Sequence, residues 1–158
     1  MLFVISLAER AAHIAGITTR PNEMWMLQMG RNLIDEESGA LGSKRYVIID
    51  RDTKYTQQFR RLVEESGTEV IRLPPMSPNL NAYAERFVRS IKEECLRKMI
   101  FVGQASLCRA IDEFMAHYHG ERNHQGLDNR LIRAELRDAA NVSPVHCRQR
   151  LGWLLNYY

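Results

Sequence analysis

Short apolar runs and amphipathic segments alternate along the first part of the chain. Runs rich in apolar or β-branched residues at 2–8 and 11–19, separated by a charged pair, predict two strands joined by a tight turn. Residues 22–37 follow with apolar side chains at helical intervals and with Asn22 as an N-cap, which predicts a helix. The compact hydrophobic run at 45–50 predicts a strand that is covered on both faces.

The next two segments repeat this alternation. Residues 55–67 carry Phe59, Leu62 and Val63 on one stripe and end at a glycine, which predicts a second helix. Residues 68–73 then return to strand character. The predicted order of elements up to this point is therefore β, β, α, β, α, β.

The second half of the chain is mainly helical in pattern. Three prolines and two asparagines in residues 74–81 predict an irregular loop. The loop precedes the longest predicted helix, 82–99, and a further helix is predicted at 106–119. The pattern then weakens and predicts only a short helix at about 145–157. The apolar stripe of the longest helix consists of Ala84, Val88, Ile91, Cys95 and Met99.

Length and composition place the chain among soluble globular proteins. Its 158 residues are about the length of one ordinary domain, which is long enough to bury a single core. The hydrophobic fraction is 45% and the charged fraction is 26%, and no apolar run approaches the ~20 residues of a membrane span. The three widely spaced cysteines, Cys95, Cys108 and Cys147, favour packing roles in a reduced cytoplasmic environment over a disulfide framework.

The formal net charge of +3 is unevenly distributed. Residues 1–84 hold ten basic and ten acidic side chains, whereas residues 85–158 hold twelve basic and nine acidic ones. This excess is compatible with a polyanionic partner such as DNA, although charge alone favours an ordinary solvated surface.

Two carboxylates are candidates for chemistry. Asp50 directly follows a predicted buried strand, at the place where α/β sheets display functional groups, although an Asp there more often caps the strand or turns the loop. Glu85 lies in the first turn of the longest predicted helix and shares a polar face with Arg89 and Lys92. Considered in isolation, that spacing more often gives an i,i+4 ion pair on a solvated face.

Three ordered motifs in the sequence resemble those of insertion-sequence transposases. The run IIDRDTKYTQQF is similar to their second-Asp motif, LPPMSPNLNAYAERFVRSIKEECL to their Glu motif, and HYHGERNHQGL to the motif that closes their catalytic core. Asp50 and Glu85, separated by residues 51–84, also match the spacing in the acidic triad of the integrase superfamily. Residues 1–133 therefore resemble the catalytic core of a transposase or retroviral-type integrase, and residues 134–158 are expected to form a C-terminal helical tail.

The resemblance implies an RNase H-like α/β fold, with a mixed sheet flanked by helices. It also implies two divalent cations, Mg²⁺ or Mn²⁺, which prefer oxygen ligands and for which Asp50 and Glu85 would be catalytic ligands. The implied activity is DNA integration by phosphoryl transfer, in which 3′ ends are processed and then joined to a target. Implied partners are transposon-end and target DNA and further copies of the chain in a homo-oligomer, in a bacterial-type cytoplasm at the nucleoid.

Several polar residues gain a DNA-binding role under this interpretation. Arg89 and Lys92 would lie beside the metals and bind phosphates. Asn81 and Tyr83 could contact the substrate too, although ordinary loop capping explains them equally well. His124 belongs to the closing motif, with a structural or DNA-proximal role.

A zinc site is a further possibility that the sequence disfavours. His117, His119 and His124 lie close together in the chain, but no cysteine pair near them has the spacing of zinc ligands.

The first Asp of the family's triad has no counterpart in this sequence. In the family it stands on a strand that precedes the one resembled by LFVISLA. Ser6 occupies a position where many relatives have a further Asp, and Asp35 matches no triad motif. Because two carboxylates alone would hold two metals poorly, we expect impaired strand transfer. The sheet would also lack its first strand, which leaves an edge that could pair with another chain.

Three functions are compatible with these observations. The first is a DNA-integrating polynucleotidyl transferase core. The second is a non-catalytic DNA-binding or dimerisation remnant of a transposase. The third is a metal-dependent nuclease of RNase H type that acts on another nucleic acid. Carboxylate-dependent binding of manganese would separate the two enzymes from the remnant.

Overall fold

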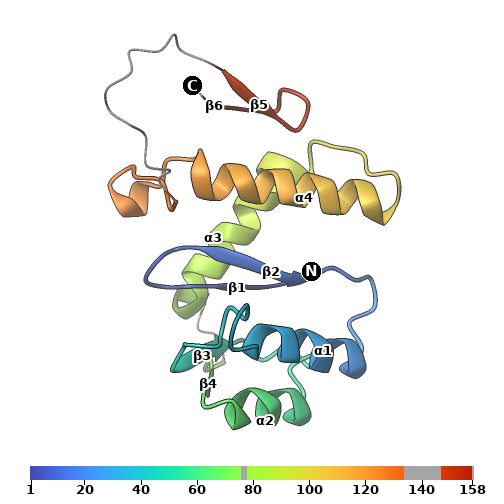
Figure 1. Ribbon diagram of the computed structural model, residues 1–158, viewed down its shortest axis with the longest axis vertical. Helices are drawn as coiled ribbons and strands as arrows, with labels where there is room; N and C mark the ends of the chain where they lie inside the picture. Colours follow the sequence, from blue (N-terminus) through green and yellow to red (C-terminus); the bar gives the residue numbers. More distant parts are fainter. Residues whose placement is uncertain (76–77, 134–146, 158) are drawn as a thin grey trace. The chain divides into compact units, whose positions relative to one another are not determined.

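The computed structural model describes residues 1–75, 78–133 and 147–157 (Figure 1). The chain divides into two compact units. The first comprises Met1–Ile5 and His13–Ala84, and the second comprises Ser6–Ala12 and Glu85–Tyr158. Helices and short strands occur together, which confirms the expected α/β class.

The chain begins with the predicted pair of strands. Strand β1 (Leu2–Ile5) pairs with β2 (Ala12–Gly16) in a two-stranded sheet. In the turn between them, the backbone N–H of Ser6 donates to the carbonyl of Ala11 at 2.9 Å, and the N–H of Arg10 donates to the carbonyl of Ser6 at 2.8 Å. The predicted tight turn is therefore confirmed.

A second two-stranded sheet contains the strand that leads to Asp50. Strands β3 (Tyr46–Ile49) and β4 (Glu69–Arg72) run parallel and are connected through helix α2 (Gln57–Glu65), as Figure 1 shows. Ile48 lies opposite Ile71 in their register. Within the described residues, the strands pair two by two in three separate sheets, where the resemblance implied one mixed sheet.

Helix α1 (Glu23–Ile34) begins where the sequence predicted. The side-chain oxygen of Asn22 accepts a hydrogen bond from the Trp25 N–H at 2.9 Å, which satisfies one of the free donors of the first turn. Gly30 allows close approach to α2, because a Cβ atom at this position would lie 3.0 Å from the Leu62 side chain. Met24, which is 79% exposed, faces away from the core.

The core of the first unit lies between these helices and one face of the β3–β4 sheet. Val47 and Val70 pack against it from the sheet. Its buried members are Leu2, Met26, Leu33, Leu41, Phe59 and Val63.

The opposite face of the β3–β4 sheet corrects one prediction. Residues 45–50 were expected to form a strand covered on both faces, but Tyr46 and Ile48 are 46% and 42% exposed, and Ile71 beside them is 39% exposed. Successive side chains of a strand point to opposite faces, so only Val47 and Ile49 turn toward the interior. Residues 45–50 are mostly apolar, yet the described part of the chain covers only one face of the β3–β4 sheet.

The predicted helix 82–99, which runs across the boundary between the two units at Ala84, is interrupted. A 3₁₀ turn η1 (Pro78–Asn81) leads into α3 (Ala82–Ile91), which is followed by a π-helical turn η2 (Lys92–Leu96). Helix α4 (Gly103–Gly120) follows. Phe87 of α3 packs edge-on against Tyr118 of α4 with ring centroids 5.2 Å apart.

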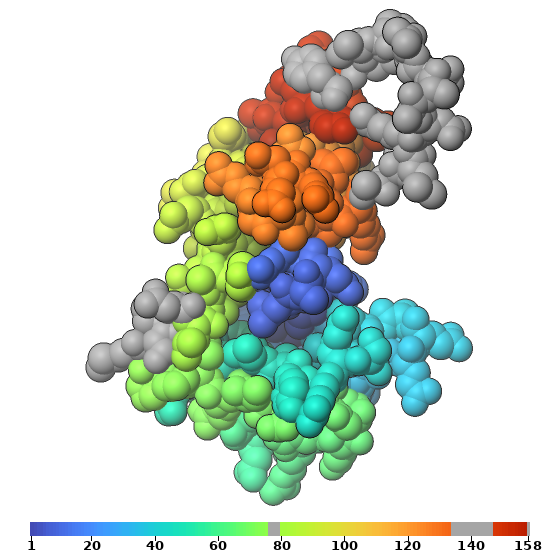
Figure 2. All heavy atoms as spheres, turned by 90° about the vertical axis from the view of Figure 1, so that its left-hand side faces the viewer, coloured from blue at the N-terminus to red at the C-terminus, as the bar shows by residue number. Residues whose placement is uncertain are grey.

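The end of the chain also differs from the prediction. Residues 134–146, which hold most of the expected helical tail and the start of the predicted helix at 145–157, lie outside the described residues. From Cys147 to Tyr157, strands β5 (Arg148–Arg150) and β6 (Leu155–Tyr157) form an antiparallel hairpin in place of a helix. Three of the four residues between them, Leu151, Gly152 and Trp153, have φ values of 52°, 60° and 77°, which a right-handed helix does not allow. Figure 2 shows this red hairpin against the orange residues around the end of α4.

None of the helices in the three described stretches is long and apolar enough to cross a membrane.

Candidate functional site

Asp50 stands at the carboxyl end of β3, as predicted, and its side chain is exposed. One carboxylate oxygen, Oδ1, accepts the backbone N–H of Asp52 at 3.0 Å. This bond fits the loop-turning role considered for Asp50. It engages Oδ1, one of the two carboxylate oxygens.

The loop that follows Asp50 is fixed by its neighbours. Arg51 donates from Nε to the carbonyl of Leu73 at 3.0 Å, which ties the loop to the end of β4. Lys54 forms an ion pair with Asp52 and holds the pKa of that carboxyl below its usual range. Burial, together with the charges of Asp50 and Asp52, raises the pKa of the Tyr55 hydroxyl. The loop that follows Asp50 is therefore held in place by contacts of Arg51 and Asp52.

Glu85 lies in the first turn of α3, as predicted, and is exposed. Arg89 and Lys92 follow one and two turns later and are also exposed, so the three side chains share a polar face. In the part of the chain that the structure describes, Glu85 and Arg89 form no ion pair, in contrast to the solvated-face alternative. We call Glu85, Arg89 and Lys92 the Glu85 face.

The two candidate carboxylates lie in different units. Asp50 belongs to the first unit, and the boundary falls within α3, between Ala84 and Glu85. Asn81 ends η1 and is half-buried, and Tyr83, one residue into α3, is 43% exposed. Both therefore lie directly before Glu85 in the chain, as the sequence indicated.

The three candidate histidines each have a different partner. His117 approaches the Glu121 carboxylate with Nδ1 at 3.2 Å, and His119 Nε2 accepts the backbone N–H of Ala12 at 3.2 Å. His124 lies 2.7 Å from the carbonyl of Tyr118 through Nε2, and burial lowers the pKa of its imidazole. These contacts support a structural role for His124, and its contact with DNA stays a prediction.

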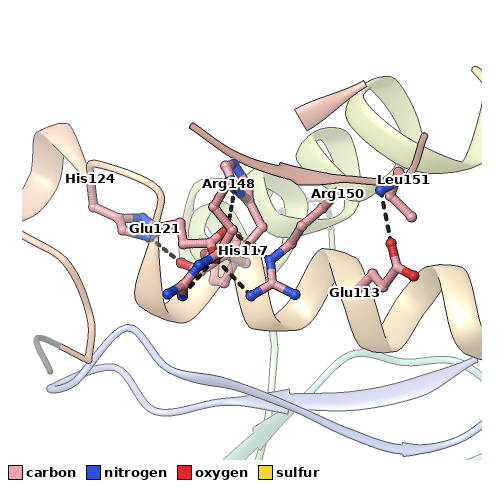
Figure 3. Close-up of polar contacts among 8 residues, drawn as sticks. Glu113, His117, Glu121, His124, Arg148, Arg150 and Leu151 are labelled. Atoms are coloured by element: carbon pink, nitrogen blue, oxygen red, sulfur yellow. Dashed lines mark hydrogen bonds and ion pairs between the residues drawn. The ribbon is translucent and has the colours of Figure 1, made fainter. Parts of the chain in front are cut away.

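Sequence reasoning missed a buried charged cluster at the end of α4, shown in Figure 3. The Glu121 carboxylate, only 2% exposed, receives two hydrogen bonds from Arg150, at 2.7 and 2.8 Å. His117 and the more distant Arg148, at 3.5 Å, approach the same carboxylate. We call His117, Glu121, Arg148 and Arg150 the Glu121 cluster.

The Glu121 cluster attaches the hairpin to α4. The hydrogen bonds from Arg150, and more weakly His117, lower the pKa of the Glu121 carboxyl. Close by, the Leu151 N–H donates to Glu113 at 2.8 Å (Figure 3). The i,i+4 spacing of His117 and Glu121 was the available signal in the sequence, but the arginines that complete the cluster lie almost thirty positions away.

Asp50 and Glu85 have the chemistry of ligands for a divalent cation. Carboxylate oxygens are the ligand type that Mg²⁺ and Mn²⁺ prefer, and Asp50 and Glu85 are both exposed acids. Within residues 1–75, 78–133 and 147–157, however, no group of three or more His, Cys, Asp or Glu side chains could hold a metal ion. The donor chemistry of Asp50 and Glu85 fits the ion.

Comparison with known proteins supports the interpretation of the sequence. Residues 66–131, less than half of the chain, match the integrase core domain family. A protein of insertion element IS476 from Xanthomonas euvesicatoria, described as an uncharacterized 39.2 kDa protein, is 30% identical over 93 residues. The match covers 58% of this chain and 27% of that protein, so the chain spans about a quarter of its relative. No solved structure matches significantly.

Proposed function

Because this chain carries an integrase-core sequence like that of insertion-element proteins, we propose that it acts on DNA as a metal-dependent phosphoryl-transfer core. In this proposal, Asp50 and Glu85 are catalytic carboxylates that bind Mg²⁺ or Mn²⁺, for 3′-end processing and strand transfer. The observation that carries the proposal is the position of Glu85. Glu85 lies within the matched residues 66–131 and is exposed in the first turn of α3. Two basic residues, Arg89 and Lys92, follow it on the same face.

The chain's own residues have defined tasks in this reaction. Asp50 presents a carboxylate whose Oδ1 is oriented by the Asp52 N–H, which leaves Oδ2 for a cation. Glu85 supplies a second carboxylate from a helix, where its backbone is rigid. A bound divalent cation supplies Lewis-acid activation of the attacking hydroxyl and charge stabilisation of the leaving oxygen.

The basic part of the Glu85 face positions the DNA. Arg89 and Lys92 bind phosphates next to the carboxylate, which gives salt-dependent affinity without base recognition. Asn81 and Tyr83 contact the same strand from the loop side, and His124 holds the closing turn. Pairing of two transposon ends requires two copies of such a core, so we include a homo-oligomer in the proposal.

Metal binding and DNA joining test the proposal together. Titration with manganese chloride in a calorimeter should give a binding signal that Asp50→Asn and Glu85→Gln each remove. Glu93→Gln, which neutralises another exposed acid two residues beyond Ile91, is the matched control and should keep the signal. Joining of a labelled transposon-end oligonucleotide should require manganese or magnesium and both carboxylates. Metal-dependent joining that survives both substitutions would refute the assignment.

A second candidate is a non-catalytic DNA-binding or dimerisation remnant. The specific observation in its favour is that the described residues form no cluster of three or more metal ligands. The remnant predicts duplex binding that Arg89→Gln and Lys92→Gln weaken, with no carboxylate-dependent manganese signal. The same titration therefore separates the two candidates.

A further inference from the structure

The connection between η2 and α4, residues 97–102, exposes two apolar side chains. Ile100 is 95% exposed and Val102 is 86% exposed, whereas Phe101 between them is half-buried. Single exposed apolar residues are common, and two nearly complete exposures within three residues make this loop a localised apolar feature of the surface.

This loop is anchored at both ends. Before it, Cys95 is fully buried and lies 3.7 Å from the Ala110 carbonyl through Sγ, and the Lys98 N–H donates to the Cys95 carbonyl at 3.1 Å. After it, the Ser106 hydroxyl donates to the Val102 carbonyl at 3.0 Å. The chain is therefore held before and after the two exposed apolar side chains.

The charge around the loop selects the kind of partner. Arg97 and Lys98 are exposed, and no ion pair engages either of them in the described part of the chain. The sequence from 95 to 111 contains three basic residues and no acidic one; acidic residues flank this stretch on both sides, and one of them, Glu94, is paired with Arg122. The loop thus presents apolar side chains next to basic side chains that form no ion pair. DNA complements both, because its phosphates are negatively charged and its stacked base pairs form an apolar interior.

We propose that residues 97–102 form a DNA wedge. Ile100 and Val102 enter a base step, and Arg97 and Lys98 bind the flanking phosphates. Side chains of this apolar type partially unstack a base step and bend the duplex by roughly 20–90°. The proposal rests on the proposed DNA function, but it assigns a contact surface separate from the Glu85 face.

Bending and salt dependence test the two parts of the wedge separately. The full chain is mixed with a duplex of about 30 base pairs that carries a dye at each end, and energy transfer reports the bend. Ile100→Ser with Val102→Ser should straighten the duplex and leave the salt dependence of binding unchanged. Arg97→Gln with Lys98→Gln should lower the slope of log affinity against log salt by about 0.9 per lost phosphate contact. Met24→Ser, at a 79% exposed apolar residue of α1, is the matched control and should change neither quantity.

The bending experiment can support the wedge or overturn it. Duplex binding that bends the DNA in wild type, but not in the Ile100 and Val102 variant, supports the wedge. Binding and bending that survive this variant overturn the wedge and leave the proposed function intact. A change in sedimentation of the variant without a change in bending also overturns it, because it assigns the loop to contact with another protein chain. Absence of any duplex binding by wild type overturns both proposals. All four substituted side chains are exposed, and circular dichroism checks that each variant is folded.

Discussion

Replacing Arg150 by methionine would leave the Glu121 carboxylate buried without its main partner. Arg150 donates two hydrogen bonds to that carboxylate, at 2.7 and 2.8 Å. The Glu121 side chain is 2% exposed, so water cannot replace the guanidinium without movement of the hairpin. Methionine keeps the apolar part of the side chain and removes only the charge and the donors.

The expected loss of unfolding free energy follows from this geometry. Removal of one partner from a buried ion pair typically costs about 3–5 kcal/mol. Here Arg150 is 24% exposed, and His117 and Arg148 stay within 3.2 and 3.5 Å of Glu121. These remaining partners reduce the cost, and we therefore expect a loss at or just below the lower end of that range, about 2–3 kcal/mol.

Hydrogen exchange measures this effect where it arises. The Leu151 N–H is bonded to Glu113, so its exchange reports whether the hairpin stays attached to α4. A loss of about 2–3 kcal/mol corresponds to roughly 30- to 150-fold faster exchange there, at 1.4 kcal/mol per factor of ten. Exchange of the amides of α2, in the other unit, is the internal control. The added substitution Glu121→Gln should recover part of the loss, because no buried charge is then left unpaired. Exchange at Leu151 within twofold of wild type would refute the reasoning.

Three further outcomes are expected. Arg150 and His117 lower the pKa of Glu121 in the folded state, so the contribution of Glu121 to stability should be complete above pH 4.5, its ordinary pKa, and should be lost as the pH falls through the lowered pKa. Urea unfolding at several pH values would measure this loss. Met26→Ala should cost about 2–5 kcal/mol of unfolding free energy, while Met24→Ala, two residues away on α1, should stay within about 0.5 kcal/mol; equal losses would contradict the assigned buried face. Trp153→Gly should raise the melting temperature, because Trp153 has φ 77° and is 70% exposed, and glycine would relieve about 1–2 kcal/mol of backbone strain with little loss of packing. A lower melting temperature would show that the indole stabilises the hairpin.

The elements of the first unit could largely be predicted from local patterns. The Asn22 cap, the α2 stripe and the strand at 46–49 are encoded within a few residues of themselves, so the order β, β, α, β, α, β was predictable. The exposure of Tyr46 and Ile48 was not predictable, because it depends on which faces other elements cover.

The second unit shows what local patterns leave out. The C-terminal hairpin depends on Arg150 reaching Glu121, a contact between residues far apart in the chain, and on a left-handed turn at Trp153 that a helical pattern does not reveal. At the π-helical turn η2, Cys95 is buried and lies against the Ala110 carbonyl of α4, a contact that the local pattern also does not contain.

The candidate site was predicted residue by residue, and its elements are where the sequence placed them. Asp50 follows β3 and Glu85 opens α3, since strand and helix boundaries are local properties. Whether these carboxylates act together depends on long-range placement, which no short pattern contains, and it stays a prediction for the manganese titration.

The half-covered β3–β4 sheet affects how the protein behaves in concentrated solution. Tyr46, Ile48 and Ile71 form an apolar strip on two short strands, and strands of this kind can associate side by side when molecules collide. Self-association should therefore increase with protein concentration, and Ile48→Thr should improve solubility because a hydroxyl replaces exposed hydrocarbon on a strand that still favours β-branched residues. We therefore expect the same strand that leads to Asp50 to lower the solubility of the protein.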